Sequence, residues 1–314
     1  MNSIKPTKLN VVVSVVIKLF LLLAIALAVY ALLRQFDMIV MPAIIKWQYG
    51  VVLLILQVFI VYLAAMSWKL LLISTTEIKL SIAEAASHVG LVLVGKYIPG
   101  KVWGSLLKVW VLQKRDKNVP SLVGVVCLEQ IVGIHSAFII GGIVYFKPMH
   151  ELFVLYIAAA VLSILFFRQF LQIGLKLTAH MLKRLKDNLY QAQEISNNLS
   201  LNKLLIIYVC NIVHWAVTGA VIAVMAQTVG MDLTGQQFIN IACASVLSIL
   251  VGFLAFFSPG GIGVREVAFV SIVGASIGYD LSVTLSMLYR VWLIIIDSLW
   301  GIFSYLYCRS NDDL

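Results

Sequence analysis

The chain has 314 residues, of which 62% are hydrophobic and 12% are charged, and its formal net charge is +9. With a mean hydropathy of +1.02 it has too little polar surface to coat a soluble globule of this size, so the composition excludes a water-soluble protein. We therefore predict an all-α, polytopic membrane protein. The excess of positive charge is explained by membrane topology and by contact with anionic lipids, so nucleic acid is not an expected partner.

Cysteine usage bears on disulfides and metals. Cys127, Cys210 and Cys243 lie within apolar stretches and Cys308 lies close to the last one. There is no CxxC pair and no Cys/His spacing typical of a zinc ligand set. We expect no disulfide, no metal site and no cofactor.

Six apolar stretches are long enough to cross a bilayer as helices. They cover residues 11–33, 50–73, 120–146, 151–167, 203–229 and 281–307. The start of the chain lacks a small-residue cleavage site after a short apolar region, so the first stretch is predicted to be a retained span. The segment 168–200 mixes basic residues with leucines and is predicted to be an amphipathic helix on the inner leaflet.

Two further apolar regions contain a Pro-Gly break. The region 80–113 is too long for one crossing and too short for two, and Pro99-Gly100 falls in its middle. This pattern predicts a re-entrant helical hairpin with its tip inside the membrane. The region 236–277 breaks at Pro259-Gly260-Gly261. Its first limb is long enough to cross fully, so both a hairpin and a crossing remain open there.

The distribution of Lys and Arg predicts the orientation. With a cytoplasmic N-terminus, only Arg34, Lys46 and Lys147 among the basic residues between apolar segments lie outside. Both termini are then cytoplasmic, and the two broken regions enter the membrane from opposite faces. Each region is preceded and followed by a span, so residues 50–146 and 203–307 of a single transmembrane domain are predicted to form an inverted-topology repeat.

The sequence also resembles a known family. The elements YIPGKVWG and SPGGIGVRE, the latter followed by a span containing MLYRVW, are similar to the membrane domain of the lysylphosphatidylglycerol synthase and flippase family. The resemblance implies a bacterial or archaeal cytoplasmic membrane protein that translocates or handles a lipid with a polar headgroup. Because the chain ends soon after its last span, we expect a stand-alone membrane domain without the synthase domain. Many members carry Gly-Glu soon after the first Pro-Gly, whereas Trp103-Gly104-Ser105 stands here, so no role is carried over to an acid at that place.

The breaks themselves predict an anion site. A Pro-Gly pair ends one helix and starts another, whose first N–H groups are unpaired and carry partial positive charge. Such an end favours an anion at membrane depth. Lys101, Ser105 and Lys108 share one helix face after the first break, and Arg265 follows the second. These side chains suit a phosphate group.

Ionised side chains inside the membrane are costly, so they must face one another or water. Structural ion pairs, Glu266 with Arg290 and Glu129 with Lys101, Lys108 or Arg265, are one interpretation, and substrate binding is the other. Lys96 is interpreted as reaching the cytoplasmic interface, and Asp297 as a structural partner. The expected substrate-binding residues are Pro99, Gly100, Lys101, Ser105, Lys108, Glu129, Pro259, Gly260, Gly261, Gly263, Arg265, Glu266 and Arg290.

Two classes of function fit these features. The first is a translocator that takes the phosphate of an anionic phospholipid or a polyprenyl-phosphate-linked substrate at the midplane while the tails stay in the bilayer. The chain has no GxxxxGK[ST] motif, so transport is expected to be downhill or ion-coupled. The second is a membrane-embedded transferase acting on a lipid-linked donor, for which no DxD or HExxH motif is found. An accessory subunit that works with cell-envelope biosynthesis proteins is a further alternative.

Overall fold

The protein is described by a computed structural model that covers residues 46–76, 78–97, 103–115, 119–146, 150–167, 169, 199–255 and 258–311. Within these ranges the regular elements are helices and there is no strand, which confirms the all-α fold class. The predicted first span, 11–33, and nearly all of the predicted amphipathic helix, 168–200, lie outside the described residues.

In the described part of the chain, five helices are long and apolar enough to cross a bilayer. They are α2 (Trp47–Thr75), α5 (Val119–Phe146), α9 (Leu201–Thr228), α10 (Gly235–Leu254) and α12 (Tyr279–Ser310). Four of them confirm the expected spans 50–73, 120–146, 203–229 and 281–307. The fifth, α10, is the first limb of the second broken region, and its 20 residues reach about 30 Å, the thickness of the hydrocarbon core.

The expected span 151–167 is present as a helix with nearly the predicted bounds. It forms α6 (His150–Leu165), a helix of 16 residues, which is about 24 Å long. Its apolar side chains remain largely exposed, among them Val154, Leu155 and Leu162. The helix is therefore apolar, as expected, but too short to cross a bilayer core of about 30 Å without local thinning of the bilayer.

The first broken region is a hairpin of α3 (Ile82–Gly95) and α4 (Trp103–Leu112). Ser81 and Glu84 form a capping box at its entrance. Arg115, which follows α4, lies 2.7 Å from the Glu84 carboxylate, so the entrance and the exit are side by side. The 14 residues of α3 extend only about 21 Å, so α3 is too short to cross the bilayer core, as expected for one limb of a re-entrant hairpin.

The second broken region consists of α10, the short 3-10 turn η2 (Pro259–Gly261) and α11 (Val264–Ile277). Gly260, Gly261 and Gly263 have φ angles of 58°, 73° and 83°, in the left-handed region that side chains with a Cβ disfavour. The glycines therefore make the sharp return possible. One limb of this pair can cross the membrane, whereas α11, with 14 residues, cannot.

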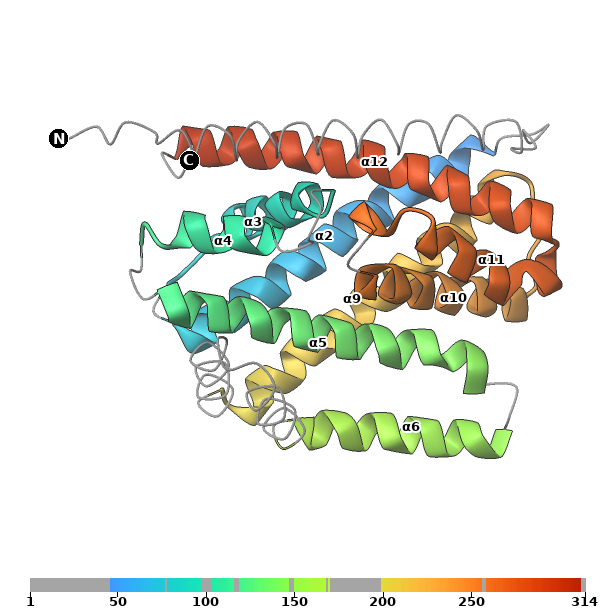
Figure 1. Cartoon of the computed structure of the whole chain (residues 1–314), viewed down its shortest axis with the longest axis horizontal. Helices are drawn as coiled ribbons and strands as arrows, with labels where there is room; N and C mark the ends of the chain where they lie inside the picture. Colours follow the sequence, from blue (N-terminus) through green and yellow to red (C-terminus); the bar gives the residue numbers. More distant parts are fainter. Residues whose placement is uncertain are drawn as a thin grey trace.

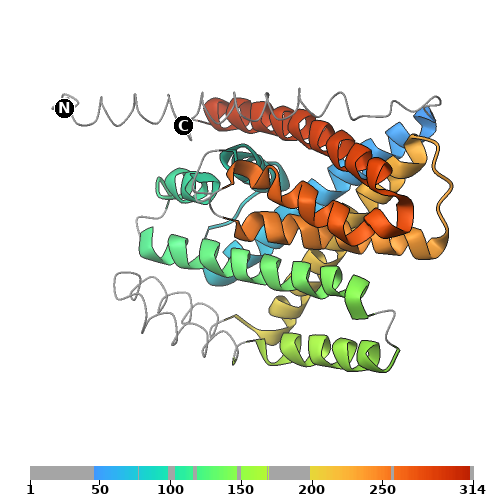
Figure 2. The same ribbon diagram turned by 45° about the vertical axis from the view of Figure 1, so that its right-hand side comes forward.

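The two helical pairs lie at opposite ends of the molecule. Figures 1 and 2 show α3 and α4 at the end where α5 begins and α12 finishes, whereas α10 and α11 lie at the end where α5 finishes and α12 begins. At the second end, Lys46 before α2 pairs with Asp232 after α9 across 3.5 Å. The two pairs therefore enter the helix bundle from opposite sides, as the sequence predicts.

Helix packing relates the two halves to each other. α2 packs along α9, α3 packs against α12, and α10 packs against α5. The helices α2, α3, α4 and α5 correspond in order to α9, α10, α11 and α12. Under this correspondence the α2–α9 contact is unchanged, and the contact of α3 with α12 corresponds to the contact of α10 with α5. Glycines permit both of the exchanged contacts: a Cβ at Gly90 on α3 would lie 2.6 Å from the carbonyl oxygen of Trp300 on α12, and one at Gly141 on α5 would lie 3.0 Å from Cα of Leu247 on α10.

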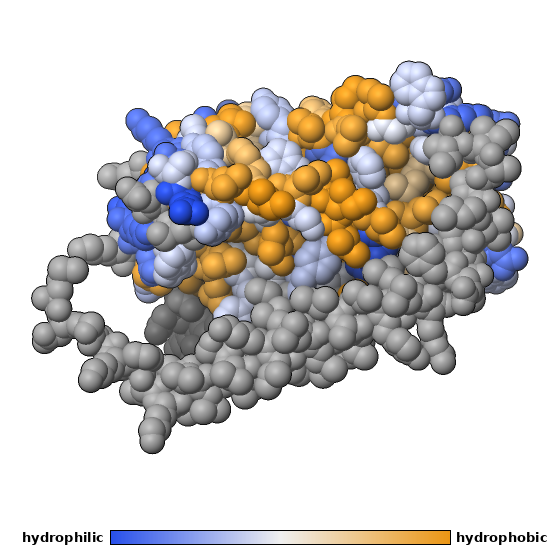
Figure 3. All heavy atoms as spheres, turned by 90° about the horizontal axis from the view of Figure 1, so that it is seen from above, coloured by the Kyte–Doolittle hydropathy of each residue, from blue (hydrophilic) through white to orange (hydrophobic). Residues whose placement is uncertain are grey.

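A small apolar cluster of Ala137, Val246 and Leu250 and two large ones form the core. One joins the end of α2 with α3, α4, α5 and the start of α9, and it includes Trp68 and Leu122. The other joins the start of α2 and the end of α9 with α10, α11 and α12, and it includes Phe269 and Leu285. Figure 3 shows a broad apolar band over the described part of one face, with polar side chains gathered at the two ends. A bilayer perpendicular to the long axis fits this distribution.

Candidate functional site

The tips of the two helical pairs meet inside the bundle. We define the first tip as Lys96 and Tyr97, which follow α3, and the second tip as residues 258–263. The N–H of Gly260 donates a hydrogen bond to the carbonyl oxygen of Lys96 at 3.0 Å. A Cβ at Gly260 would lie 3.4 Å from the ring of Tyr97. The tips of two helical pairs that enter the bundle from opposite ends are thus in direct contact.

Arg290 on α12 holds the second tip. Its Nη1 donates to the carbonyl oxygen of Gly260 at 3.1 Å, and its Nη2 lies 2.9 Å from Oε1 of Glu266. Oε2 of Glu266 accepts a hydrogen bond from the N–H of Gly263 at 2.6 Å. The ion pair between Glu266 and Arg290, one of the structural alternatives from the sequence, is therefore present and is almost fully buried.

Asp297, about two helical turns after Arg290, holds the first tip. Its Oδ2 accepts a hydrogen bond from Tyr97 Oη at 2.6 Å and lies 2.7 Å from Nζ of Lys96. The Asp297 side chain is only 3% exposed. Lys96, interpreted from the sequence as an interfacial residue, thus forms an ion pair with a buried carboxylate of α12.

Arg265 differs from the other cations of the site. It has no carboxylate partner in the described ranges, its guanidinium carbon lies 4.6 Å from the ring centroid of Tyr289, and its Nη2 is buried without a hydrogen-bond partner. A buried donor without a partner carries a desolvation cost of about 1–3 kcal/mol. Such a group is ready to bind an anion that enters beside it.

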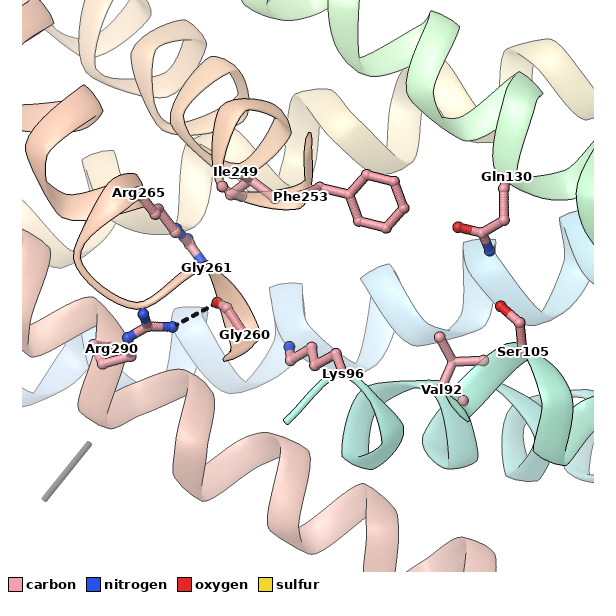
Figure 4. Close-up of a pocket in the computed structure, with 12 residues that line it drawn as sticks. Val92, Lys96, Ser105, Gln130, Ile249, Phe253, Gly260, Gly261, Arg265 and Arg290 are labelled. Atoms are coloured by element: carbon pink, nitrogen blue, oxygen red, sulfur yellow. Dashed lines mark hydrogen bonds between the residues drawn. The ribbon is translucent and has the colours of Figure 1, made fainter. Parts of the chain in front are cut away.

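A cavity of about 110 Å³ lies between the tips and is lined by Lys96, Ser105, Gln130, Arg265 and Arg290, together with backbone at Gly260 and Gly261. Figure 4 shows the two arginines beside the second tip, Lys96 between the arginines and the far wall, and Gln130 and Ser105 on that far wall. Three cations and only two carboxylates, Glu266 and Asp297, belong to this group. The first cavity therefore has an excess of positive charge.

Three amide hydrogens of the second break already have acceptors. Gly260 donates to Lys96, Gly261 donates to the carbonyl oxygen of Ser258 at 3.1 Å, and Gly263 donates to Glu266. These three donors are therefore not available to an anion, whereas the side chains of the arginines and the lysine line the cavity and supply its positive charge.

A second cavity of about 240 Å³ adjoins the first and shares Val92, Gln130, Ile249 and Phe253 with it. It contains the Lys108–Glu129 pair, whose Nζ lies 2.7 and 2.8 Å from the two carboxylate oxygens. Lys108 also lies over the ring of Trp68, 4.1 Å from its centroid. Among the partners considered for Glu129, the structure thus shows Lys108, while Arg265 belongs to the first cavity.

The structure brings together most of the predicted site residues. Ser105, Gly260, Gly261, Arg265 and Arg290 line the first cavity, and Lys108 and Glu129 line the second. Glu266 and Gly263 support the second tip, to which Pro259 also belongs. Pro99, Gly100 and Lys101 lie outside the described residues.

Two polar residues of the first cavity are absent from the sequence-based set. Lys96 lines the first cavity, and Gln130 lines both cavities. The sequence contains a signal for Gln130, because it follows Glu129 in an apolar span and an amide inside a membrane helix is costly unless it has a hydrogen-bond partner. The place of Lys96 depends on Asp297, which is 201 positions later in the chain, so local patterns do not reveal it.

The fold and the site define a polytopic membrane protein with two helical pairs inserted from opposite sides around a cationic cavity. The chain belongs to the family of the lysylphosphatidylglycerol synthase transmembrane region, whose model matches residues 10–301. No curated protein and no solved structure matches the chain. Membership indicates a membrane function related to lipids.

Proposed function

We propose that this protein translocates a lipid with an anionic, phosphate-containing headgroup across the cytoplasmic membrane, with both termini on the cytoplasmic side. The observation that carries the proposal is that Arg265 lines the cavity between the tips and that its buried Nη2 has no hydrogen-bond partner among the described residues. A bound phosphate would supply the acceptor that this guanidinium lacks. The family membership supports a lipid as the source of that phosphate.

The other groups of the first cavity fit a phosphate in number and charge. Arg265 presents a planar set of donors suited to two phosphate oxygens, and Lys96 adds a point charge. Ser105 and Gln130 have no hydrogen-bond partner in the described part of the chain and stand on the opposite wall. At about 30 Å³ for each water molecule, the first cavity holds roughly four waters, which is space for one compact group such as a phosphate.

The arrangement of the halves supports a transport cycle. The tips belong to residues 50–146 and 203–307, which we propose to be two repeats that rock against each other. The contact between Gly260 and Lys96 closes the space between the tips. Separation of the halves on either side would open the cavity to that side, while the acyl or polyprenyl tails remain among the bilayer lipids.

Reconstitution into liposomes tests the proposal. The purified full-length chain is mixed with lipids that carry a fluorescent acyl chain and an unmodified headgroup, and external dithionite then reduces every fluorophore that reaches the outer leaflet. We expect the inner pool of at least one phosphate lipid to become reducible. Arg265→Gln should abolish this movement, because hydrogen bonds to a charged group contribute about 1.5–3 kcal/mol each.

Arg309→Gln is the matched control, since Arg309 is exposed at the end of α12 and its replacement should leave the movement unchanged. If no lipid moves and the protein instead turns over a lipid-linked sugar or aminoacyl donor, the translocation proposal is wrong and the transferase alternative replaces it. Equal loss of movement in both arginine variants would show that net charge, rather than the cavity, is responsible.

A further inference from the structure

The second cavity has more polar lining residues than the Lys108–Glu129 ion pair needs, and the phosphate proposed for the first cavity does not need them either. Ser67 on α2, Glu129 and Gln130 on α5, and Asn211 and His214 on α9 all line it, with apolar residues such as Leu250 and Phe253 between them. At about 30 Å³ for each water molecule, it holds roughly eight waters, about twice the content of the first cavity. A headgroup larger than a phosphate would extend into this space.

The second cavity is balanced in charge. Lys108 is 2% exposed and Glu129 is 18% exposed, and the ammonium group contacts both carboxylate oxygens. In the described residues around this cavity no further Lys, Arg, Asp or Glu is present. The first cavity attracts a negative group, whereas the second offers no net attraction to either sign of charge.

The hydrogen bonds already made inside the protein leave mainly acceptors for a ligand. Asn211 donates both amide hydrogens, one to Ser67 Oγ at 2.7 Å and one to the carbonyl oxygen of Ile207 at 2.9 Å, so its Oδ1 remains. His214 must donate from Nδ1 to the carbonyl oxygen of Ile60 at 3.1 Å, because a carbonyl can only accept. This leaves Nε2 as an acceptor in the neutral ring.

Glu129 and Gln130 complete this set. Each oxygen of Glu129 accepts one hydrogen bond from Lys108 and retains a lone pair. Gln130 forms no hydrogen bond with the described residues and lines both cavities. These acceptors, together with the Gln130 amide, which can donate as well as accept, suit hydroxyl groups in a charge-balanced space, because a hydroxyl is an uncharged group that both donates and accepts.

We propose that the second cavity binds an uncharged, hydroxyl-rich group that is attached to the phosphate held in the first cavity. The inference rests on the proposed lipid site and specifies its headgroup as a polyol phosphate. Gln130, at the boundary, would contact both parts of the headgroup. An ammonium group is disfavoured because Lys108 already neutralises Glu129, and a second anion is disfavoured because no cation is left for it.

Competition binding tests this preference. The full-length chain in detergent is exposed to equimolar lipids with identical acyl chains, and native mass spectrometry measures which lipids remain bound. The probes are phosphatidylglycerol and phosphatidylinositol as polyol lipids, phosphatidic acid as phosphate alone, and phosphatidylethanolamine and lysylphosphatidylglycerol as ammonium lipids. A polyprenyl-phosphate hexose distinguishes a glycan carrier from a glycerophospholipid.

We expect the polyol lipids to be retained roughly three- to tenfold more than phosphatidic acid or the ammonium lipids, the effect of one or two net hydrogen bonds. Gln130→Leu and, independently, His214→Phe should remove most of this ratio. Ser105→Ala, on the first cavity, is the matched variant: it should weaken all phosphate lipids alike and keep the ratio. If Gln130→Leu impairs folding, the retention ratio measured for His214→Phe decides whether the second cavity prefers polyol lipids.

Failure of this inference is distinct from failure of the proposed function. Retention of every phosphate lipid to the same extent, or a preference for an ammonium lipid, overturns the polyol assignment even if lipids cross the liposome bilayer. A polyol preference that His214→Phe removes supports the assignment, and it does so even if no lipid crosses, in which case the translocation proposal fails alone.

Discussion

The amide of Gly260 and the carbonyl oxygen of Lys96 are joined by a hydrogen bond of 3.0 Å, and they belong to helical pairs that enter the bundle from opposite ends. One wall of the first cavity therefore comes from each half of the protein. Arg290 and Asp297, both on α12, reach one tip each. Any motion that separates the halves must change these contacts, so the shape of the first cavity depends on the relative position of the two halves.

The buried ion pair of the second tip should be important for stability. Arg290 is 6% exposed, and Glu266→Gln leaves its charge without a partner, which costs about 3–5 kcal/mol for a buried pair. Glu84→Gln is the matched control, because Arg115 is 37% exposed and an exposed pair contributes about 1 kcal/mol or less. Thermal denaturation in detergent should show a much lower melting temperature for Glu266→Gln, and equal values would contradict the burial of this pair.

Loss of Asp297 should have opposite effects on stability and on anion binding. Asp297→Asn removes the carboxylate that compensates Lys96, so the folded state loses a buried partner while the first cavity gains one unit of net positive charge. We expect a lower melting temperature together with stronger retention of phosphatidic acid in native mass spectrometry. Asp280→Asn, exposed in the first turn of α12, should change neither quantity; weaker retention in Asp297→Asn would argue against a cationic anion site.

Replacement of Lys108 should change which headgroups the second cavity binds. Lys108→Gln leaves the carboxylate of Glu129 without its cation, and an ammonium headgroup can then take the place of Nζ. A hydrogen bond to a charged group contributes about 1.5–3 kcal/mol, which corresponds to roughly a ten- to hundredfold gain in affinity. Retention of phosphatidylethanolamine relative to phosphatidylglycerol should rise accordingly, and the double variant Lys108→Gln/Glu129→Gln should lose this gain.

Close packing of α3 on α12 should depend on Gly90. A Cβ there would lie 2.6 Å from the carbonyl oxygen of Trp300 and would overlap the hydroxyl of Ser304, so Gly90→Ala should cost about 1–3 kcal/mol through overpacking. Gly50→Ala provides the control, because no atom lies within 4 Å of the added Cβ and alanine favours helix. A melting temperature for Gly90→Ala at or above that of the parent would disprove the close contact of these helices.

Chemical labelling checks the proposed orientation. In a background without the four native cysteines, a membrane-impermeant thiol reagent added to intact cells should modify Gly235→Cys, at the start of α10. It should not modify Arg309→Cys, at the end of α12, until the membrane is permeabilised. The physical reason is the strong bias of Lys and Arg toward one side of the apolar segments. Labelling with the reverse accessibility would invert the topology.

The long helices could be located from the sequence because their lengths and hydropathy are set by the bilayer itself. The boundaries of α2, α5, α9 and α12 follow the predicted spans closely. α6 (His150–Leu165) also lies within two residues of its predicted bounds, and it differs from the others only in being shorter than the roughly 20 residues that a crossing helix needs. For the second broken region, the sequence left two possibilities, and the 20-residue length of α10 selects a limb that can cross.

The sequence by itself determined the membrane class, the helical breaks and the kinds of side chain that had to face inward, because burial of charge in a bilayer is costly at any position. Only the tertiary structure decided the partners: Lys108 for Glu129, Asp297 for Lys96, and no carboxylate in the described ranges for Arg265. It also showed that the amides of Gly260, Gly261 and Gly263 are occupied by Lys96, Ser258 and Glu266. Pairing depends on distances between segments far apart in the chain, and those distances are set by the packing of α3 on α12 and of α10 on α5, which local patterns do not contain.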